Sequence, residues 1–569
     1  MTASAAASAA ALARSATLYY DTGVVTQDKE PPVHGKTLSL GLDSSTQSVT
    51  AVVLDLDTGS IVFQHAIDYA TDPRLNGYGI HHSEYIVPSR EPGEADQPPE
   101  MYLASLDAMF ADLRSAGVDM GAISVINDSG QQHGHVYLGA NAGTLFSRLQ
   151  SKAAPEDKLV NLLDGLFTYG TAPIWKTSNT ASQANDIRAG VGGKDRIIRL
   201  SGSDSPLRFT GAVIRRVAEQ FPDLYAATDT IQLVSSFIPA VLTGNHRVPM
   251  DFGNGCGTSL MDYSSRTWSN ELLGAASAQL PQGVDGLKKK LPALTAPDSV
   301  VGTVCSYFAG RYGLNPSCRV AAGSGDNPQT KVLVAGDLLS LGSSFVNMVS
   351  TDGTAFDMEG YANGMYDGIG RPFMFGCRTN GAMVWTGVRA MHGLGRDDYE
   401  EADGSLGSTA VGEKVFLWQP DRESFPVSGI LQPTRIGYDG PDLAADYAGV
   451  IESSLGIVYL YSRGFAGKNS DPIAVTGGVT KVGEILRRVA GIWNRPVTII
   501  GTVGAALGAA VAGACALTKD GAGSYDVEGI SEAVLPRGEV ISPRPSDIQA
   551  YHGDNGYLRR LEREYEKRL

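Results

Sequence analysis

Apolar residues along the chain fall into two kinds of run, short ones typical of strands and longer ones at helical spacing. The short runs predict strands at residues 37–42, 49–54, 122–127, 319–322, 331–341, 345–348, 473–476 and 497–500. Two pairs of these strands flank a tight turn and so predict hairpins. Because strands and helices alternate in both halves of the chain, the pattern predicts an α/β protein with mixed sheets and two large lobes. A ligand of such a protein would lie in a cleft between the lobes, at the strand ends.

The longer apolar runs predict helices. Pro99 fits the first position of one helix, whose apolar residues continue to residue 113. Further helices are predicted at residues 212–219, 230–242, 443–461, 484–493, 503–517 and 557–569. The run 503–517 consists of small residues with interspersed glycine and is too short to span a membrane, so we expect a packed core helix. We therefore expect no membrane partner.

Composition narrows the class of protein. The chain has 569 residues, of which 43% are hydrophobic and 19% charged, which suits a globular protein with more than one core. A formal net charge of −15 argues against a nucleic-acid partner. The five cysteines are scattered without metal-ligand spacing, and an odd number in a large chain favours reduced thiols inside the cell.

The chain divides into four predicted segments. Residues 1–36 form a tail whose first part is rich in Ala and Ser and free of acidic residues, and it is either disordered or an organelle-targeting sequence. Residues 37–310 and 311–518 are the two predicted lobes, and residues 519–569 are an extension with a surface helix. We expect a cytoplasmic protein, although the tail leaves an organelle open, and the sequence also leaves a homodimer open.

Both predicted hairpin turns carry glycine and small hydroxyl residues. The first turn offers Ser44, Ser45 and Thr46, and the second offers Gly342 and Ser343. Glycine lets the backbone approach an anion, and the N–H groups and hydroxyls of such a turn can point at a phosphate. Either turn alone is an ordinary hairpin in most proteins. Two of them in one chain favour a duplicated architecture that closes on a nucleoside triphosphate.

Three aspartates lie where phosphoryl transfer would need them. Asp43 sits inside the first turn, where a carboxylate beside phosphate needs a cation such as Mg²⁺; the alternative is an Asx-turn residue. Asp251 follows an extended run and precedes a glycine-rich loop, so it can act as the base for an attacking hydroxyl or serve only as a turn carboxylate. Asp326 follows a predicted strand and can face the metal or the substrate, unless it belongs to a plain turn.

Other polar and aromatic residues are suited to binding a sugar or a nucleotide. A Gln-Gln-His run after the strand at 122–127 includes Gln132 and His133, which can hydrogen-bond the hydroxyls of a polyol. Trp175 can offer a flat apolar face to a sugar ring or chain. Gly477 and Gly478 end a predicted strand and can let adenosine lie close to the backbone. For each of these residues a purely structural role is the alternative.

Taken in order, these motifs resemble the FGGY carbohydrate kinases over roughly residues 36–517. The motifs are LDSSTQS at 42–48, SGQQHG at 129–134, RFTG at 208–211, LVSSF at 233–237, GDNP at 325–328, SLGSS at 340–344 and TGG at 476–478. Within that family, the QQHG run is most similar to the xylulose kinases. The resemblance implies two ribonuclease-H-like lobes of the actin and hexokinase type, with ATP and Mg²⁺ bound.

The resemblance also implies an activity: transfer of the γ-phosphate of ATP to a terminal hydroxyl of a ketose, with D-xylulose as the first candidate. Two alternatives stay open, a kinase of another ketose or polyol such as ribulose or glycerol, and a sugar- or nucleotide-binding protein with little catalysis. The second alternative is disfavoured because both Asp43 and Asp251 are intact.

Site roles carry over to this chain residue by residue. Asp251 matches the catalytic base and Asp43 the metal or phosphate aspartate. The implied sugar-binding residues are Gln132, His133, Trp175, Asp326 and Asn327, and the implied nucleotide-binding residues are Ser44, Ser45, Thr46, Gly342, Ser343, Gly477 and Gly478. One departure stands out: Thr177 replaces an aspartate usual two residues after the pocket tryptophan, and Lys176 adds a positive charge there. This departure leaves the identity of the sugar open.

Overall fold

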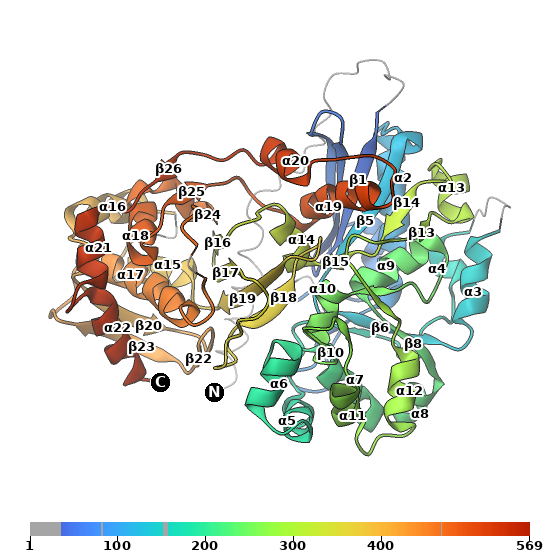
Figure 1. Ribbon diagram of the computed structural model, residues 1–569, viewed down its shortest axis with the longest axis horizontal. Helices are drawn as coiled ribbons and strands as arrows, with labels where there is room; N and C mark the ends of the chain where they lie inside the picture. Colours follow the sequence, from blue (N-terminus) through green and yellow to red (C-terminus); the bar gives the residue numbers. More distant parts are fainter. Residues whose placement is uncertain (1–35, 81–82, 152–156, 396, 468) are drawn as a thin grey trace.

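The computed structural model describes residues 36–80, 83–151, 157–395, 397–467 and 469–569, so the predicted tail up to residue 35 lies outside the described residues. The chain folds into two lobes, each built on a seven-stranded sheet (Figure 1). The first sheet contains β1 (Leu38–Ser44), β2 (Ser48–Asp55), β3 (Ser60–Asp68), β5 (Ile123–Gly130), β13 (Val300–Thr303), β14 (Arg319–Ala321) and β15 (Ser324–Gly325). The second contains β16 (Leu338–Leu341), β17 (Phe345–Ser350), β18 (Asn363–Tyr366), β19 (Pro372–Arg378), β24 (Ile473–Thr476), β25 (Val497–Ile499) and β26 (Val540–Ile541).

The two sheets repeat one strand arrangement. In the first sheet β3, β2 and β1 pair antiparallel in that order, after which β5 and β14 continue in parallel. In the second sheet β19, β17 and β16 pair antiparallel, and β24 and β25 again continue in parallel. The predicted duplication and the α/β class are therefore confirmed.

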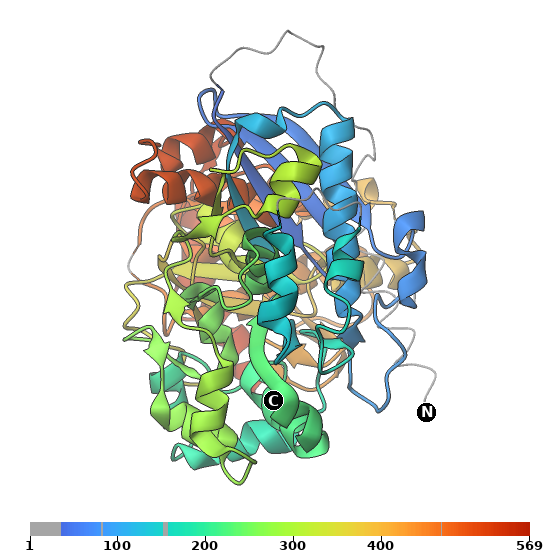
Figure 2. The ribbon, with the colours of Figure 1, turned by 90° about the vertical axis from the view of Figure 1, so that its right-hand side faces the viewer.

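Helices cover both faces of the first sheet. On one face lie α2 (Pro99–Ser115), α9 (Val234–Thr243) and α13 (Ser306–Tyr312), whose apolar residues form one core with β1 and β5. On the other face lies α19 (Ala505–Lys519), where a Cβ atom on Gly41 would meet the Ala506 carbonyl oxygen at 1.9 Å. Figure 2 shows the blue strands between the light-blue α2 and the red helices. Glycine at position 41 therefore allows helix and strand to touch through their backbones.

A helical subdomain with its own core extends the first lobe. It contains α5 (Ala181–Gly190), α6 (Lys194–Ser201), α7 (Thr210–Gln220), α8 (Pro222–Ala227), α11 (Asn270–Ser277), α12 (Gly283–Lys290) and the antiparallel pair of β6 (His135–Gly139) and β8 (Thr228–Leu233). It lies at the lower right in Figure 1.

The second lobe is packed mainly by helices from the end of the chain. These are α15 (Ala382–Met391), α17 (Leu443–Ser462), α18 (Gly483–Trp493), α21 (Pro545–His552) and α22 (Tyr557–Glu566). By length and composition α17 is apolar enough to cross a membrane, but 83% of its apolar window is buried inside the protein. Helix α22 was expected at the surface, yet Tyr557, Leu561 and Tyr565 on one of its faces are buried in the core.

Three sequence expectations differ from the structure. Residues 230–242 were predicted as one helix, but β8 pairs with β6 before α9 begins. Residues 331–341 were predicted as one strand, but Lys331 lies in α14 (Asp326–Val332) and β16 starts at Leu338. The predicted lobe boundary at 310/311 falls inside the first sheet, because β14 and β15 both pair with β5.

The lobes are joined through α14 and α19. The chain leaves the first sheet through α14 into β16, and it returns after β25 through α19. A third apolar core contains residues of both lobes, among them Val125 and Phe252 from the first and Met365 and Phe373 from the second. In Figure 1 the two helices lie at the centre of the molecule, between the sheets.

Candidate active site

Asp43 lies near the end of β1 and is oriented by the neighbouring strand. Its register partner across the parallel pair with β5 is Ser129, whose Oγ donates a hydrogen bond of 2.8 Å to Asp43 Oδ1. Burial, and then the charge of Asp326, raise the pKa of Asp43 to about 7, although the Ser129 hydroxyl counteracts them. The ends of β1 and β15 flank β5 at the same register, which brings Asp326 near enough to Asp43 for its charge to act there.

Asp326 begins α14 directly after β15. The Asn327 N–H donates to Asp326 Oδ1 at 2.8 Å, and Asn327 Nδ2 donates to Gln132 Oε1, also at 2.8 Å. Both Asp326 and Asn327 are partly exposed. Burial raises the pKa of Asp326 to about 6, and hydrogen bonds from backbone N–H groups moderate that rise. The predicted residues Asp43, Gln132, Asp326 and Asn327 are thus brought together by three strand ends.

Asp251 does not lie open to a ligand, which differs from the sequence expectation. Its side chain is 0% exposed, and its Oδ2 atom accepts hydrogen bonds from Ser324 Oγ at 2.7 Å and from the Asn254 N–H at 2.8 Å. The second bond caps the short helix α10 (Phe252–Gly255). Burial raises the pKa of Asp251 to about 7. Ser324 immediately precedes Gly325 and Asp326. Its hydrogen bond to Asp251 therefore holds the segment that carries Asp326 in place.

A third carboxyl group near Asp43 was not identified from the sequence. Asp128 precedes Ser129 in β5 and is 0% exposed, and neither of its carboxyl oxygens has a hydrogen-bond partner among the described residues. Burial and the charge of Asp43 raise its pKa well above the usual range. The sequence offered one signal that could have found it: a carboxyl residue at the end of the predicted strand, directly before a Ser-Gly pair.

The first hairpin turn is connected to the predicted sugar-binding tryptophan. Trp175 is 44% exposed, and its indole Nε1 donates a hydrogen bond of 2.8 Å to Thr46 Oγ1. Ser45 Oγ instead donates to the Ser48 carbonyl within the turn. The Ser44 hydroxyl is buried, on the strand face opposite Asp43. Of the three predicted hydroxyls, the one on Ser44 therefore does not face a ligand at this turn.

The two residues after Trp175 bond the backbone of a neighbouring loop. Thr177 is 1% exposed, and its Oγ1 donates to the Ala95 carbonyl at 3.1 Å. Lys176 Nζ donates to the Glu84 carbonyl at 2.9 Å. Both side chains hold the Trp175 segment against the loop at residues 84–95. The departure from the family motif at Lys176 and Thr177, which left the identity of the sugar open, thus concerns residues that hold the Trp175 segment in place.

His133 is held as a neutral ring. Its Nδ1 lies 2.9 Å from the Gly257 carbonyl oxygen, and the ring stacks on Phe209 with centroids 4.5 Å apart. Burial lowers the pKa of His133 to about 3, and the nearby Arg208 adds to this. Because Nδ1 must carry the proton to bond a carbonyl, Nε2 is left as an acceptor. Arg208, which sequence reasoning placed in a motif without a role, lies close to His133 and to Cys377 of the second lobe.

The predicted nucleotide loops meet in the second lobe. Gly342 and Ser343 form the turn between β16 and β17, and their carbonyls accept hydrogen bonds from N–H groups at the start of α15. Gly477 follows β24 at a φ of 112°, and a Cβ atom there would lie 2.3 Å from the Leu341 carbonyl oxygen. Gly478 is exposed and has no atom within 4 Å of such a Cβ position. The two loops therefore touch through their backbones and leave Gly478 open.

The carboxylates fit a divalent cation carried by a nucleotide better than a metal held by the protein alone. In the described part of the chain no group of three or more His, Cys, Asp or Glu residues is arranged to hold a metal ion. Yet the charge of Asp326 raises the pKa of Asp43, and a cation held beside these two carboxylates would offset that cost of ionising Asp43. Oxygen ligands of this kind suit Mg²⁺, which keeps several waters and shares phosphate oxygens.

Comparison with known proteins agrees with this arrangement. Residues 168–332 match the model of the "FGGY family of carbohydrate kinases, N-terminal domain". The chain is 30% identical over 531 residues to D-xylulose kinase A of Aspergillus niger, covering 83% of this chain and 88% of that protein. The protein therefore belongs to the FGGY family and is a carbohydrate kinase.

Solved structures show the same fold. A xylulose kinase from Rhodospirillum rubrum superposes with a TM-score of 0.76 at 17% identity, over 93% of this chain and 98% of that chain. A gluconate kinase from Lactobacillus acidophilus gives 0.75 at 16% identity, over 94% and 98%. The two-lobed actin and hexokinase-type fold expected from the sequence is confirmed.

Proposed function

We propose that the protein transfers the γ-phosphoryl group of ATP to a terminal hydroxyl of D-xylulose, with Mg²⁺. The observation that supports this substrate is the similarity to D-xylulose kinase A, which extends over 88% of that relative. The QQHG run, whose Gln132 bonds Asn327 next to Asp326, is consistent with a polyhydroxylated substrate. We also propose that the protein works in the cytoplasm.

We assign the general base to Asp326 rather than to Asp251. Asp326 is partly exposed and lies near enough to Asp43 to raise its pKa, whereas Asp251 is fully buried and its Oδ2 atom is already bonded twice. As the sugar oxygen approaches the γ-phosphorus, Asp326 accepts its proton. Asp251 orients Ser324 and thereby the segment that carries Asp326. A raised pKa suits this task because a carboxylate with a pKa of about 6 is a stronger base and is still ionised at neutral pH.

The neighbouring side chains orient the sugar and the cation. Asn327 and Gln132 form an amide pair that can bond hydroxyls of the sugar. The neutral His133 offers Nε2 as an acceptor, and Trp175 covers the apolar edge of the sugar. Asp43 would hold Mg²⁺, which neutralises charge on the phosphoryl oxygens during transfer.

The experiment is ADP release from Mg²⁺-ATP with D-xylulose, D-ribulose, L-xylulose or glycerol, and with no sugar. We expect D-xylulose to stimulate release far more than the other compounds. Stimulation by another compound alone would keep the kinase and replace the substrate. No stimulation by any of them, with ATP still bound, would support the binding-protein alternative.

A further inference from the structure

Helix α14 carries Asp326 at its first position and Lys331 near its end, and it joins the two lobes. Its first residue lies near Asp43 in the first lobe, and its last residue leads through residues 333–337 into β16 of the second lobe. Figure 1 shows α14 between the two sheets. Because α14 has only seven residues, we expect a shift at one end to be passed to the other.

Lys331 fixes the carboxyl end of α14. Its side chain is 1% exposed, and Nζ donates hydrogen bonds to the carbonyls of Val334 at 2.6 Å, Gly336 at 2.9 Å and Ala335 at 3.3 Å. The same Nζ bonds Ser350 Oγ at 3.0 Å, and Ser350 is the last residue of β17. The ammonium group therefore ties the helix and the connecting segment to the second sheet.

A turn of the second lobe attaches α14 from another side. Arg371 Nη2 donates to the Val332 carbonyl at 2.9 Å, while its Nε bonds Asp367 at 2.5 Å. The Gly368 N–H donates to the Pro328 carbonyl at 3.0 Å. These contacts come from the turn between β18 and β19. Each of them anchors α14 to the lobe that carries the nucleotide loops.

The other half of α14 is bonded to the first lobe. Asn327 bonds Gln132, and Gln329 Nε2 donates to the Asp128 carbonyl at 3.0 Å, next to the serine that orients Asp43. Burial lowers the pKa of Lys331 to about 8, with Asp367 acting in the opposite direction, so the side chain is still charged at neutral pH. One helix is thus held by both lobes, with the base at one end and a buried cation at the other.

We propose that Lys331 is a positioning residue, which transmits the placement of the second lobe along α14 to Asp326. The inference rests on the proposed role of Asp326. Removing the ammonium group frees the end of the helix from the second sheet, but it removes no side chain proposed to touch the sugar, and Asn327 keeps its bond to Gln132 of the first lobe. Turnover should therefore fall while the affinity for the sugar stays the same.

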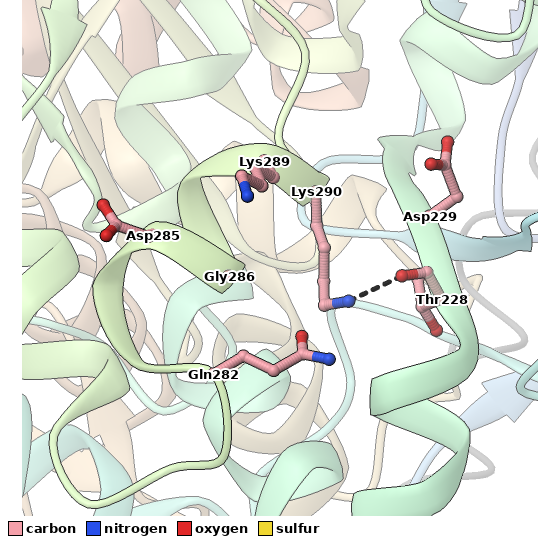
Figure 3. Close-up of a pocket in the computed structure, with 7 residues that line it drawn as sticks. All are labelled: Thr228, Asp229, Gln282, Asp285, Gly286, Lys289 and Lys290. Carbon is pink, nitrogen blue, oxygen red and sulfur yellow. Dashed lines mark hydrogen bonds between the residues drawn. The ribbon is translucent and has the colours of Figure 1, made fainter.

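The experiment compares Lys331→Met with Lys331→Arg and with a matched control, Lys290→Met. Lys290 is also buried, at 5% exposure, and its Nζ also donates to a backbone carbonyl, that of Thr228 at 2.6 Å. Figure 3 shows this bond at a cavity of about 400 Å³ lined by residues of α12 and β8, outside the proposed active site. The control therefore loses a buried lysine of the same kind without touching α14.

We expect Lys331→Met to lower kcat about 10- to 100-fold, with the sugar KM changed by less than about threefold. Lys331→Arg should recover most of the turnover, because a guanidinium can still bond several carbonyls. Lys290→Met should keep wild-type kcat. Small-angle scattering with Mg²⁺ and the non-hydrolysable analogue AMP-PNP should show a contraction of the wild type that Lys331→Met lacks.

Two results would overturn the inference. One is a Lys331→Met enzyme with the kcat and the contraction of the Lys290→Met control. The other is a Lys331→Met enzyme with a lower kcat, a sugar KM raised well beyond threefold, a lowered melting temperature and no rescue by arginine, which would mean a purely structural role. If the wild type phosphorylates no sugar, the proposed function fails. The scattering comparison then still tests whether Lys331 is needed for the contraction with Mg²⁺ and AMP-PNP.

Discussion

At the scale of single residues, the question is which aspartate takes the proton. From the sequence, Asp251 and Asp326 look alike, since each follows a strand and precedes glycine- or asparagine-containing turns. Only the folded chain separates them, because burial and hydrogen-bond partners depend on contacts with Ser324 and Asn254. Sequence motifs could therefore name the candidate residues, but separating the two carboxylates by burial and hydrogen bonding needed the tertiary structure.

The first prediction is a difference between two isosteric variants. Asp326→Asn should lower kcat by about 100- to 10,000-fold, because an amide cannot accept the proton from the attacking hydroxyl. Asp251→Asn should lose much less, since an amide oxygen can still accept the bonds from Ser324 and Asn254. Coupled ADP-release kinetics measures both. A larger loss in Asp251→Asn than in Asp326→Asn would return the base to Asp251.

The second prediction concerns pH. The pKa of Asp326 is raised to about 6, and only its deprotonated form can act as the base. We therefore expect kcat/KM to fall about tenfold per pH unit as the pH drops below about 6. Because Asp43 and Asp326 interact, this acidic limb reports on the pair. Initial rates between pH 5 and 8 test it. The limb should persist in Asp251→Asn, and its loss there would assign the limb to Asp251.

At the scale of elements, sequence patterns predicted most strands and helices but failed where contacts between distant segments decide. Residues 230–233 were assigned to a helix, yet they pair as a strand with β6 because Leu138 and its neighbours offer an edge there. Lys331 was assigned to a strand, yet its ammonium group closes the end of α14. Neither partner is visible in a local window of sequence, which is why the periodicity was insufficient.

The third prediction tests the contact between the two nucleotide loops. Gly477→Ala should destabilise the fold by about 1–3 kcal/mol, because the new Cβ would lie 2.3 Å from the Leu341 carbonyl oxygen and the φ of 112° disfavours any side chain. The strained turn should also raise the KM for ATP. Thermal melting and kinetics measure these effects. Gly478→Ala is the matched control, since its Cβ position is open; equal effects in both variants would contradict the argument.

At the scale of the whole molecule, the duplicated sheets matter less for function than the two helices between them. The sheets hold one set of turns each, whereas α14 is bonded to both lobes and α19 returns from the second lobe to pack on the first sheet. The predicted lobe boundary missed this arrangement, since a linear division of the chain cannot show that α19 packs on β1 after a long excursion through the second lobe. The placement of Asp326 relative to the loops at Gly342 and Gly477 therefore depends on how the two lobes are assembled.

The fourth prediction tests the contact between these two helices. A Cβ atom on Gly508 of α19 would lie 1.9 Å from the Gln329 carbonyl oxygen of α14. The backbone fixes the positions of both atoms, so a change of side-chain rotamer cannot relieve the clash. Gly508→Ala should therefore push the helices apart, at a cost of about 1–3 kcal/mol of stability, and lower kcat because α14 carries Asp326.

Gly274→Ala is the matched control: it lies in α11 with no atom within 4 Å of the new Cβ, so the same substitution should stabilise that helix by up to about 1 kcal/mol. Urea unfolding and ADP-release kinetics measure both variants. Gly508→Ala with wild-type stability and kcat would show that the two helices can separate without cost, and α14 could then not link the lobes as argued.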